Sequence, residues 1–344
     1  MTNRRTEHGQ VLIMFALCII VLMGFAALSI DVGMVLTVQT ELQNVADAAA
    51  YAGIARLVSG DYYSAVSDAV RFGNINTVQC LVNNLSASDI ELGTYDFNTH
   101  VFTAAPLGVP AGSNAIRVVA SRNRYSINGP LRLMFGSVLG RSSTDVQAST
   151  ISALDRRVTG FDGSIAGVLL PFAVNEAMVG TPPVLGRVVD MYPNHDQWNV
   201  VPGGPIQTAP GNFGLLDLAG GAGSPGTPTI RDWIDNGYPG IFEIPPSGSF
   251  PMEGAPGLRN TIGSNVLVRA GQTVLVLVHN GVSGSGSNSV YNIVGLLAVR
   301  ILFVTGNGSN LHMYVQVVEY ASSGFITGPG GVYNTSVAKT TLVQ

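Results

Sequence analysis

The residues best suited to catalysis lie in the stretch DMYPNHDQWN, where Asp190, His195 and Asp196 stand close to Trp198. A histidine within reach of a carboxylate can act as a general base, and an aromatic ring beside polar side chains can bind a sugar. The same residue types also serve turns and solvation in loops rich in Pro and Asn. We therefore expect a loop without catalytic function, with a membrane-tethered envelope hydrolase or carbohydrate-binding protein as the alternative.

Motifs for cofactor and metal binding are weak. Gly221, Gly223 and Gly226 fit the G-x-G-x-x-G pattern of dinucleotide sites, but Pro225 lies inside it and no clear βαβ unit surrounds it. The histidines never stand at a spacing such as H-E-x-x-H, and no G-x-S-x-G or Walker A motif is present. Three carboxylates lack the alternating spacing of an EF-hand calcium loop; they are Asp232, Asp235 and Glu243. We predict no catalytic, cofactor-binding or metal site, and no enzyme.

The composition differs from that of an ordinary soluble domain. Hydrophobic residues make up 46% of the 344 residues and charged residues 11%, against roughly 25% charged residues in typical globular domains. The formal net charge is -4 and Lys339 is the only lysine, so no nucleic-acid partner is expected. Of the two cysteines, Cys18 lies in an apolar stretch away from Cys80, so we predict no internal disulfide framework.

An apolar stretch near the N-terminus has the length of a membrane span. Residues 11–30 read VLIMFALCIIVLMGFAALSI, without a charged residue, and a helix needs about 20 such residues to cross a bilayer. Arg4 and Arg5 precede the stretch and the next basic residue is Arg56, which places the N-terminus in the cytoplasm. The predicted membrane anchor is represented by Val11, Phe15, Leu22, Phe25 and Ile30.

The end of this stretch leaves one alternative open. Small residues around Ala27 suit a signal-peptidase site, but the apolar core of a signal peptide is only about 7–15 residues long. We therefore expect the anchor to stay uncleaved. Asp31 follows the span, and we expect it to be a boundary residue exposed to the lipid headgroups rather than an intramembrane functional carboxylate.

Beyond Asp31 the helix is expected to continue as a stalk poor in bulky side chains. Leu42, Val45, Ala46 and Ala49 recur at helical spacing, followed by Gly53. Alanine favours helix, and small side chains let another backbone approach closely. The favoured interpretation is a core helix of its own domain; the alternative is a packing face for another subunit.

The order of these segments resembles a known family. EHGQ, the apolar span, DVG at 31–33, LQN at 42–44 and ADAAA at 46–50 are similar to the N-terminal segment of TadE/TadG-like proteins of the Flp (tight adherence) pilus assembly system. The resemblance implies a structural component rather than an enzyme. It assigns stalk packing to Asp31, Gly33, Leu42, Asn44, Ala46, Asp47, Ala49 and Gly53.

The resemblance also implies a location and partners. The chain would be a single-pass protein of the bacterial cytoplasmic (inner) membrane, with its bulk in the periplasm or extracytoplasmic space. Its partners would be the lipid bilayer, other Tad pilus or envelope proteins, and further copies of itself. Some relatives are pseudopilins cut after a glycine with a glutamate five positions on, but Met14 stands there relative to Gly9, which argues against such processing.

Periodicity after the stalk predicts helix, three strands, helix and strand. The first helix covers DYYSAVSDAVRFGNIN, and IELGTYDF and VFTAAP flank a turn at 98–100. NAIRVVASR is a third strand and STDVQASTISALD a fourth. Between them, GPLRLMFGSVLG has Pro130 near its start, apolar residues in helical register and Gly140 beyond its end, so a helix is expected. This order predicts an antiparallel sheet covered by the stalk helix.

The remainder of the chain is rich in Gly, Pro and Asn. We predict strands in QTVLVLVHN, YNIVGLLAVRILFV and LHMYVQVVEY, where Leu311, Met313, Val315 and Val317 alternate with polar residues, and a helix in TPTIRDWIDNG. The predicted fold class is α+β with a β-rich C-terminal domain. The predicted domains are a cytoplasmic N-terminus at 1–10, a transmembrane helix at 11–30, the stalk helix and α+β domain at 31–158, and the β-rich domain at 159–344.

Overall fold

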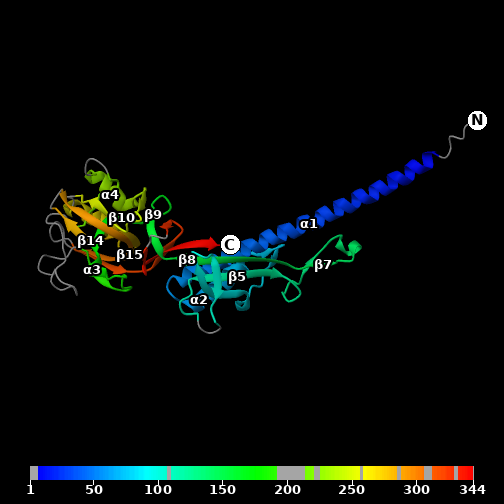
Figure 1. Ribbon diagram of the computed structural model, residues 1–344, viewed down its shortest axis with the longest axis horizontal. Helices are drawn as coiled ribbons and strands as arrows, with labels where there is room; N and C mark the ends of the chain where they lie inside the picture. The colour runs from blue at the N-terminus through cyan, green and yellow to red at the C-terminus, as the bar shows by residue number, and fades with distance from the viewer. Residues whose placement is uncertain are drawn as a thin grey trace, which may run out of the picture. The chain divides into compact units, whose positions relative to one another are not determined.

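The chain folds into two compact units. The computed structural model describes residues 7–106, 110–191, 214–220, 225–255, 259–284, 288–305, 312–328 and 332–343. Unit 1 comprises Met1–Ala153 and Leu342–Gln344, and unit 2 comprises Leu154–Thr341. The α+β class with a β-rich C-terminal part is confirmed (Figure 1). The predicted domain limits at residues 10, 30 and 158 remain predictions.

Unit 1 is organised around α1 (Glu7–Leu57), one continuous helix that runs from the N-terminal end into the folded part of the unit (Figure 1). The antiparallel helix α2 (Tyr62–Ile75) packs on its C-terminal part. The Asp61 side chain starts α2 by accepting the backbone N–H of Ser64 at 3.0 Å. The face that α2 buries consists of Ala65, Ala69 and Gly73. The predicted first helix is therefore confirmed.

The sheet of unit 1 includes the strands β8, β5, β3 and β4 in that order, with antiparallel pairing throughout. Along β5, buried and half-buried residues alternate, and α1 packs against this strand. All four strands were predicted, including the hairpin turn at 98–100. The strands and short elements of unit 1 are β1 (Thr77–Val78), β2 (Leu81–Val82), η1 (Ala87–Asp89), β3 (Ile90–Asp96), β4 (Val101–Ala104), β5 (Ala115–Arg122), β6 (Leu131–Arg132), η2 (Gly136–Leu139), β7 (Ser143–Thr144) and β8 (Val146–Asp155).

The helix predicted between Pro130 and Gly140 is wrong. The segment is a hairpin in which β6 pairs with β7 and only the single 3-10 turn η2 lies between them. The apolar periodicity that favoured a helix does not correspond to one buried face, because Leu131 is buried while Met134 and Val138 are exposed. Gly140 adopts a left-handed conformation with φ 79°, which closes η2. A contact with a distant part of the chain, described below, outweighs the local pattern.

Unit 2 has one large sheet in the order β10-β14-β15-β16-β11, with β13 on β15, and a smaller sheet in which β9 pairs with β12, β18 and β19. The β10–β14 pair is parallel, and the other pairs of the large sheet are antiparallel. α4 packs on β10 and α5 on β15. The predicted strands β14, β15 and β16 and the predicted helix α4 are confirmed, although Leu311 lies outside the described residues.

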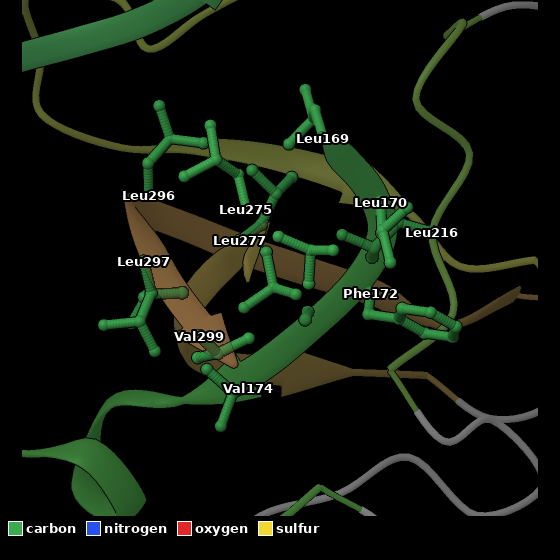
Figure 2. Packing of buried hydrophobic residues seen from close by; sticks show 14 of the residues in the cluster. Leu169, Leu170, Phe172, Val174, Leu216, Leu275, Leu277, Leu296, Leu297 and Val299 are labelled. Carbon is green, nitrogen blue, oxygen red and sulfur yellow. The ribbon is translucent and has the colours of Figure 1, made fainter. Parts of the chain in front are cut away.

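The elements of unit 2 are β9 (Arg157–Asp162), β10 (Leu169–Asn175), α3 (Glu176–Val179), β11 (Val188–Asp190), α4 (Thr227–Asn236), β12 (Ile241–Glu243), β13 (Phe250–Glu253), α5 (Arg259–Val268), β14 (Thr273–Ser283), β15 (Val290–Thr305), β16 (His312–Val317), β17 (Tyr320–Ser322), β18 (Phe325–Thr327), β19 (Val332–Tyr333) and β20 (Val337–Val343). Figure 2 shows how side chains of β10, β14 and β15 meet in the core of this unit. Every residue of β10 is buried, as expected for a strand covered on both faces.

Candidate membrane anchor and stalk

The first part of α1 exposes apolar side chains on all sides. The five predicted anchor residues are exposed to between 50% and 66%, at Val11, Phe15, Leu22, Phe25 and Ile30. A helix that is hydrophobic all round is stable only when another apolar medium covers it. At 1.5 Å per residue, residues 11–30 span about 30 Å, the thickness of the hydrocarbon core. By length and composition, α1 is a candidate membrane helix.

From Asp31 onward, α1 has two different faces. Among the predicted stalk residues, Leu42, Ala46, Ala49 and Gly53 are buried inside unit 1, and Asp47 is half-buried. Asp31 is also buried, whereas Gly33 and Asn44 are exposed. The small residues of the stalk are thus used inside the chain's own domain, which agrees with the favoured interpretation. Any subunit that binds the stalk must contact its exposed face.

The small residues are needed because α2 and β5 approach α1 closely. A Cβ atom added to Gly53 would lie 3.1 Å from the backbone oxygen of Ala65, 3.2 Å from the Cβ atom of Ala69, and in steric overlap with Ile116. On the facing helix, a Cβ atom on Gly73 would lie 3.2 Å from the Cβ atom of Ala49. Backbones in such contact leave no room for a larger side chain.

A polar contact fixes the rotation of α1 on the sheet. The Gln43 side-chain amide donates to Asp47 Oδ1 at 2.8 Å and to Thr150 Oγ1 at 2.6 Å. Thr150, which lies buried in β8, donates its hydroxyl hydrogen to the same Asp47 oxygen. The partly buried Asp47 carboxylate meets both donors in only one rotation of α1 relative to the sheet. Asp47 therefore has a structural role within unit 1.

Asp31 is the point at which the stalk meets the β6–β7 hairpin. Only 6% of this residue is exposed, so the expectation that it faces the headgroups is wrong. Its carboxylate accepts the backbone N–H of Met134 at 2.8 Å and that of Phe135 at 3.0 Å. Two backbone N–H donors satisfy the hydrogen-bonding capacity of this buried carboxylate. The sequence did not reveal this contact because the donors lie more than 100 positions away.

Replacing Asp31 with alanine should detach the hairpin from α1. Two backbone N–H groups would lose their acceptor, at a cost of about 1–3 kcal/mol in the free energy of unfolding. Hydrogen exchange at Met134 and Phe135 should become faster in Asp31→Ala. Asp145→Ala removes an exposed carboxylate beside the hairpin and should leave both amides protected. Equal exchange rates in the two variants would contradict the assigned role of Asp31.

Of the residues singled out for catalysis, Asp190 alone lies within the described part of the chain. His195, Asp196 and Trp198 lie outside it, as do Gly221 and Gly223. Asp190 is paired with His312, whose Nδ1 atom lies 2.6 Å from Asp190 Oδ2 across the β11–β16 pair.

The three carboxylates considered as calcium ligands in the sequence analysis have local structural surroundings instead. Asp232 accepts a hydrogen bond from Asn236, and Asp235 accepts from the Asn265 amide at 2.8 and 2.9 Å. Glu243 ends the short strand β12. Among the residues that the structure describes, no group of three His, Cys, Asp or Glu side chains could hold a metal ion. The lack of a cofactor or metal remains a prediction for the whole chain.

One buried histidine, which the sequence analysis did not single out, has a strongly shifted pKa. His279 of β14 is 3% exposed and packs edge-on against Tyr291, with ring centroids 5.0 Å apart. Burial lowers the pKa of His279 to about 4, and it raises the pKa of Tyr291 to about 12. The Tyr291 hydroxyl accepts the Gly214 N–H at 3.0 Å.

The stability of unit 2 should fall as the pH drops from 6.5 toward 4. In this pH window His279 binds a proton in the unfolded chain but not in the folded one. The free energy of unfolding should therefore fall by about 3 kcal/mol at most. His279→Phe should reduce this pH dependence, as measured by urea unfolding followed through the buried Trp233. His100→Gln, in the exposed turn of unit 1, should retain it. A pH dependence that is unchanged in His279→Phe would contradict the prediction.

Comparison with known proteins gives matches to two family models in the N-terminal part of the chain. Residues 9–58 match a family model described as Flp pilus-assembly TadE/G-like, and residues 36–152 match a second model, described as Tad-like Flp pilus-assembly. The two matches overlap in the stalk and together cover α1 from Gly9 and nearly all of unit 1. The search of curated proteins and the search of solved structures gave no match. The resemblance predicted from the sequence is confirmed.

Proposed function

We propose that this chain is a membrane-anchored structural component of a Tad-type pilus or a related adhesion or secretion apparatus, because residues 9–58 match the TadE/G-like model and residues 36–152 match the Tad-like model of Flp pilus assembly. The observation that carries the proposal is the continuity of α1. The same helix presents an apolar span and then the core face of the family domain, so the folded unit is joined rigidly to the anchor. The match to pilus-assembly families supports a structural rather than a catalytic role.

The charge pattern supports one orientation. Arg4 and Arg5 precede the span, and no further Lys or Arg occurs before Arg56. The positive-inside rule then puts the N-terminus in the cytoplasm and the residues that follow the span on the other side of the bacterial inner membrane. Fractionation and the intact mass of the native protein test this. A full-length membrane protein is expected; a chain lacking its first nine or so residues, or cut near Ala27, would contradict an uncleaved anchor.

We propose that the protein acts by binding other envelope proteins through the exposed face of the stalk. The buried face of α1 is occupied by α2 and β5, which leaves positions such as Asn44 and the 45% exposed Tyr51 free to meet a partner. The partners that the family match supports are other proteins of the same pilus system, and we propose further copies of this chain as a second class of partner.

Site-specific photo-crosslinking in cells tests this function. A photoreactive residue at Asn44 or Tyr51 should form adducts with other proteins of the pilus system or with a second copy, identified by mass spectrometry. The matched control is Tyr63 of α2, which is 86% exposed but lies off the stalk. Failure of both stalk positions to form any adduct beyond that of the Tyr63 control would refute binding through the stalk.

A further inference from the structure

The β6–β7 hairpin presents an apolar tip that the folded unit does not cover. We define the hairpin tip as residues 133–139, which read LMFGSVL. Met134 is 66% exposed, Phe135 37% and Val138 84%. Adjacent exposed apolar side chains of this size usually mark a surface that meets another apolar phase. Something other than unit 1 is therefore expected to contact this tip.

The position of the tip is fixed by α1. Asp31, which accepts the backbone N–H groups of Met134 and Phe135, directly follows the apolar span. The hairpin reaches out from the sheet along α1 (Figure 1). The tip is thus held at the level where α1 would leave the hydrocarbon core.

The surface of α1 near this point is also apolar. Val32 is 49% exposed and Leu36 58%, so the apolar surface of the helix continues beyond Asp31. Asp31 itself does not interrupt this surface because its charge is buried under the hairpin. The tip and this part of α1 therefore form neighbouring apolar surfaces at one depth.

The residues that flank the tip complete the pattern of an interfacial element. Arg132 precedes it and Arg141 follows it, and both are exposed. Arginine at the edge of an apolar segment extends its guanidinium toward phosphate groups while its aliphatic part stays on apolar surface. Basic residues are attracted to the headgroup region of anionic membranes.

From these observations we infer that the hairpin tip enters the headgroup–acyl boundary of the bilayer beside α1 and is a second membrane contact of this protein. Apolar side chains enter the boundary, and the two arginines remain at the headgroups. Two contacts in place of one would restrict the tilt of unit 1 on the membrane. The inference rests on α1 being the anchor, as proposed above.

Fluorescence quenching in lipid vesicles tests the inference with the full chain. An environment-sensitive dye is placed at Val138→Cys in a background in which Cys18 and Cys80 are serine, and the protein is reconstituted into vesicles that contain nitroxide-labelled lipids. The control dye is placed at Tyr63→Cys, since Tyr63 and Val138 are equally exposed at 86% and 84%. The dye at position 138 should be quenched several-fold more strongly than the dye at position 63.

A third sample separates this inference from the anchor itself. Labelling the native Cys18, with Cys80 replaced by serine, places the dye inside the predicted span. Quenching at position 18 together with water-like emission at position 138 would overturn the second contact and leave the anchor intact. Absence of quenching at both positions would overturn both. Met134→Asp in the Val138→Cys protein places a charged side chain on the hairpin tip and should reduce the quenching at position 138.

Discussion

Replacing Ile20 and Leu22 together with arginine should remove the protein from the membrane. Both residues lie at the centre of the apolar part of α1 and are 66% exposed. An arginine at the centre of a membrane helix costs about 3 kcal/mol, and the isoleucine or leucine that it replaces contributes about 0.5 kcal/mol. The double substitution should therefore oppose insertion by about 7 kcal/mol, enough to reverse the equilibrium by several orders of magnitude.

The measurement is extraction of isolated membranes with alkaline carbonate. The native chain should remain in the pellet, and Ile20→Arg/Leu22→Arg should be extracted or fail to leave the cytoplasm. The control carries the same charge outside the span, as Gln39→Arg/Asn44→Arg at two exposed positions of the stalk. A double variant in the span that resists extraction as the native chain does would show that another part of the protein holds it in the membrane.

The parts of unit 1 that the sequence predicts are those governed by short-range patterns. The strand β5 could be predicted from its β-branched residues, and α2 from Ala65, Ala69 and Phe72 at helical spacing. The structure shows alternate burial along β5, and it buries Ala65 and Ala69 of α2. The span could be predicted because its apolar residues are consecutive and include no charged residue. Pattern and structure agree here because each segment buries the face that its own period defines.

Asp31 and the hairpin show where such predictions fail. A carboxylate after a span is ordinarily exposed, and an apolar run between Pro130 and Gly140 ordinarily forms a helix. Each expectation is wrong because of the other segment: the hairpin supplies the donors that bury Asp31, and Asp31 binds the N–H groups at the start of the turn. A contact over a separation of 103 residues leaves no periodic signal in either segment. The same limit applies to the Gln43, Asp47 and Thr150 contact.

Gly53→Leu should disrupt the core of unit 1, although the substitution favours helix. Leucine is preferred over glycine in a helix by nearly 1 kcal/mol. At Gly53 this gain is outweighed, because the first added carbon already lies 3.1 Å from the Ala65 backbone oxygen and overlaps Ile116. Overpacking costs about 1–3 kcal/mol and more where the obstacle is backbone, so we expect a loss of at least 3 kcal/mol. α2 should separate from α1.

Two further substitutions separate the cost of overpacking from the gain in helix propensity. Gly33→Leu makes the same change on the same helix, where an added Cβ atom meets nothing within 4 Å, and it should be neutral or slightly stabilising. Gly53→Ala should lie between them, since the end of the Ile116 side chain can move and the Ala65 carbonyl cannot. Thermal unfolding and hydrogen exchange of α2 in the full chain measure the order of stability of the three variants. If Gly53→Leu were as stable as Gly33→Leu, the α1–α2 contact would not be the close packing that requires a stalk of small residues.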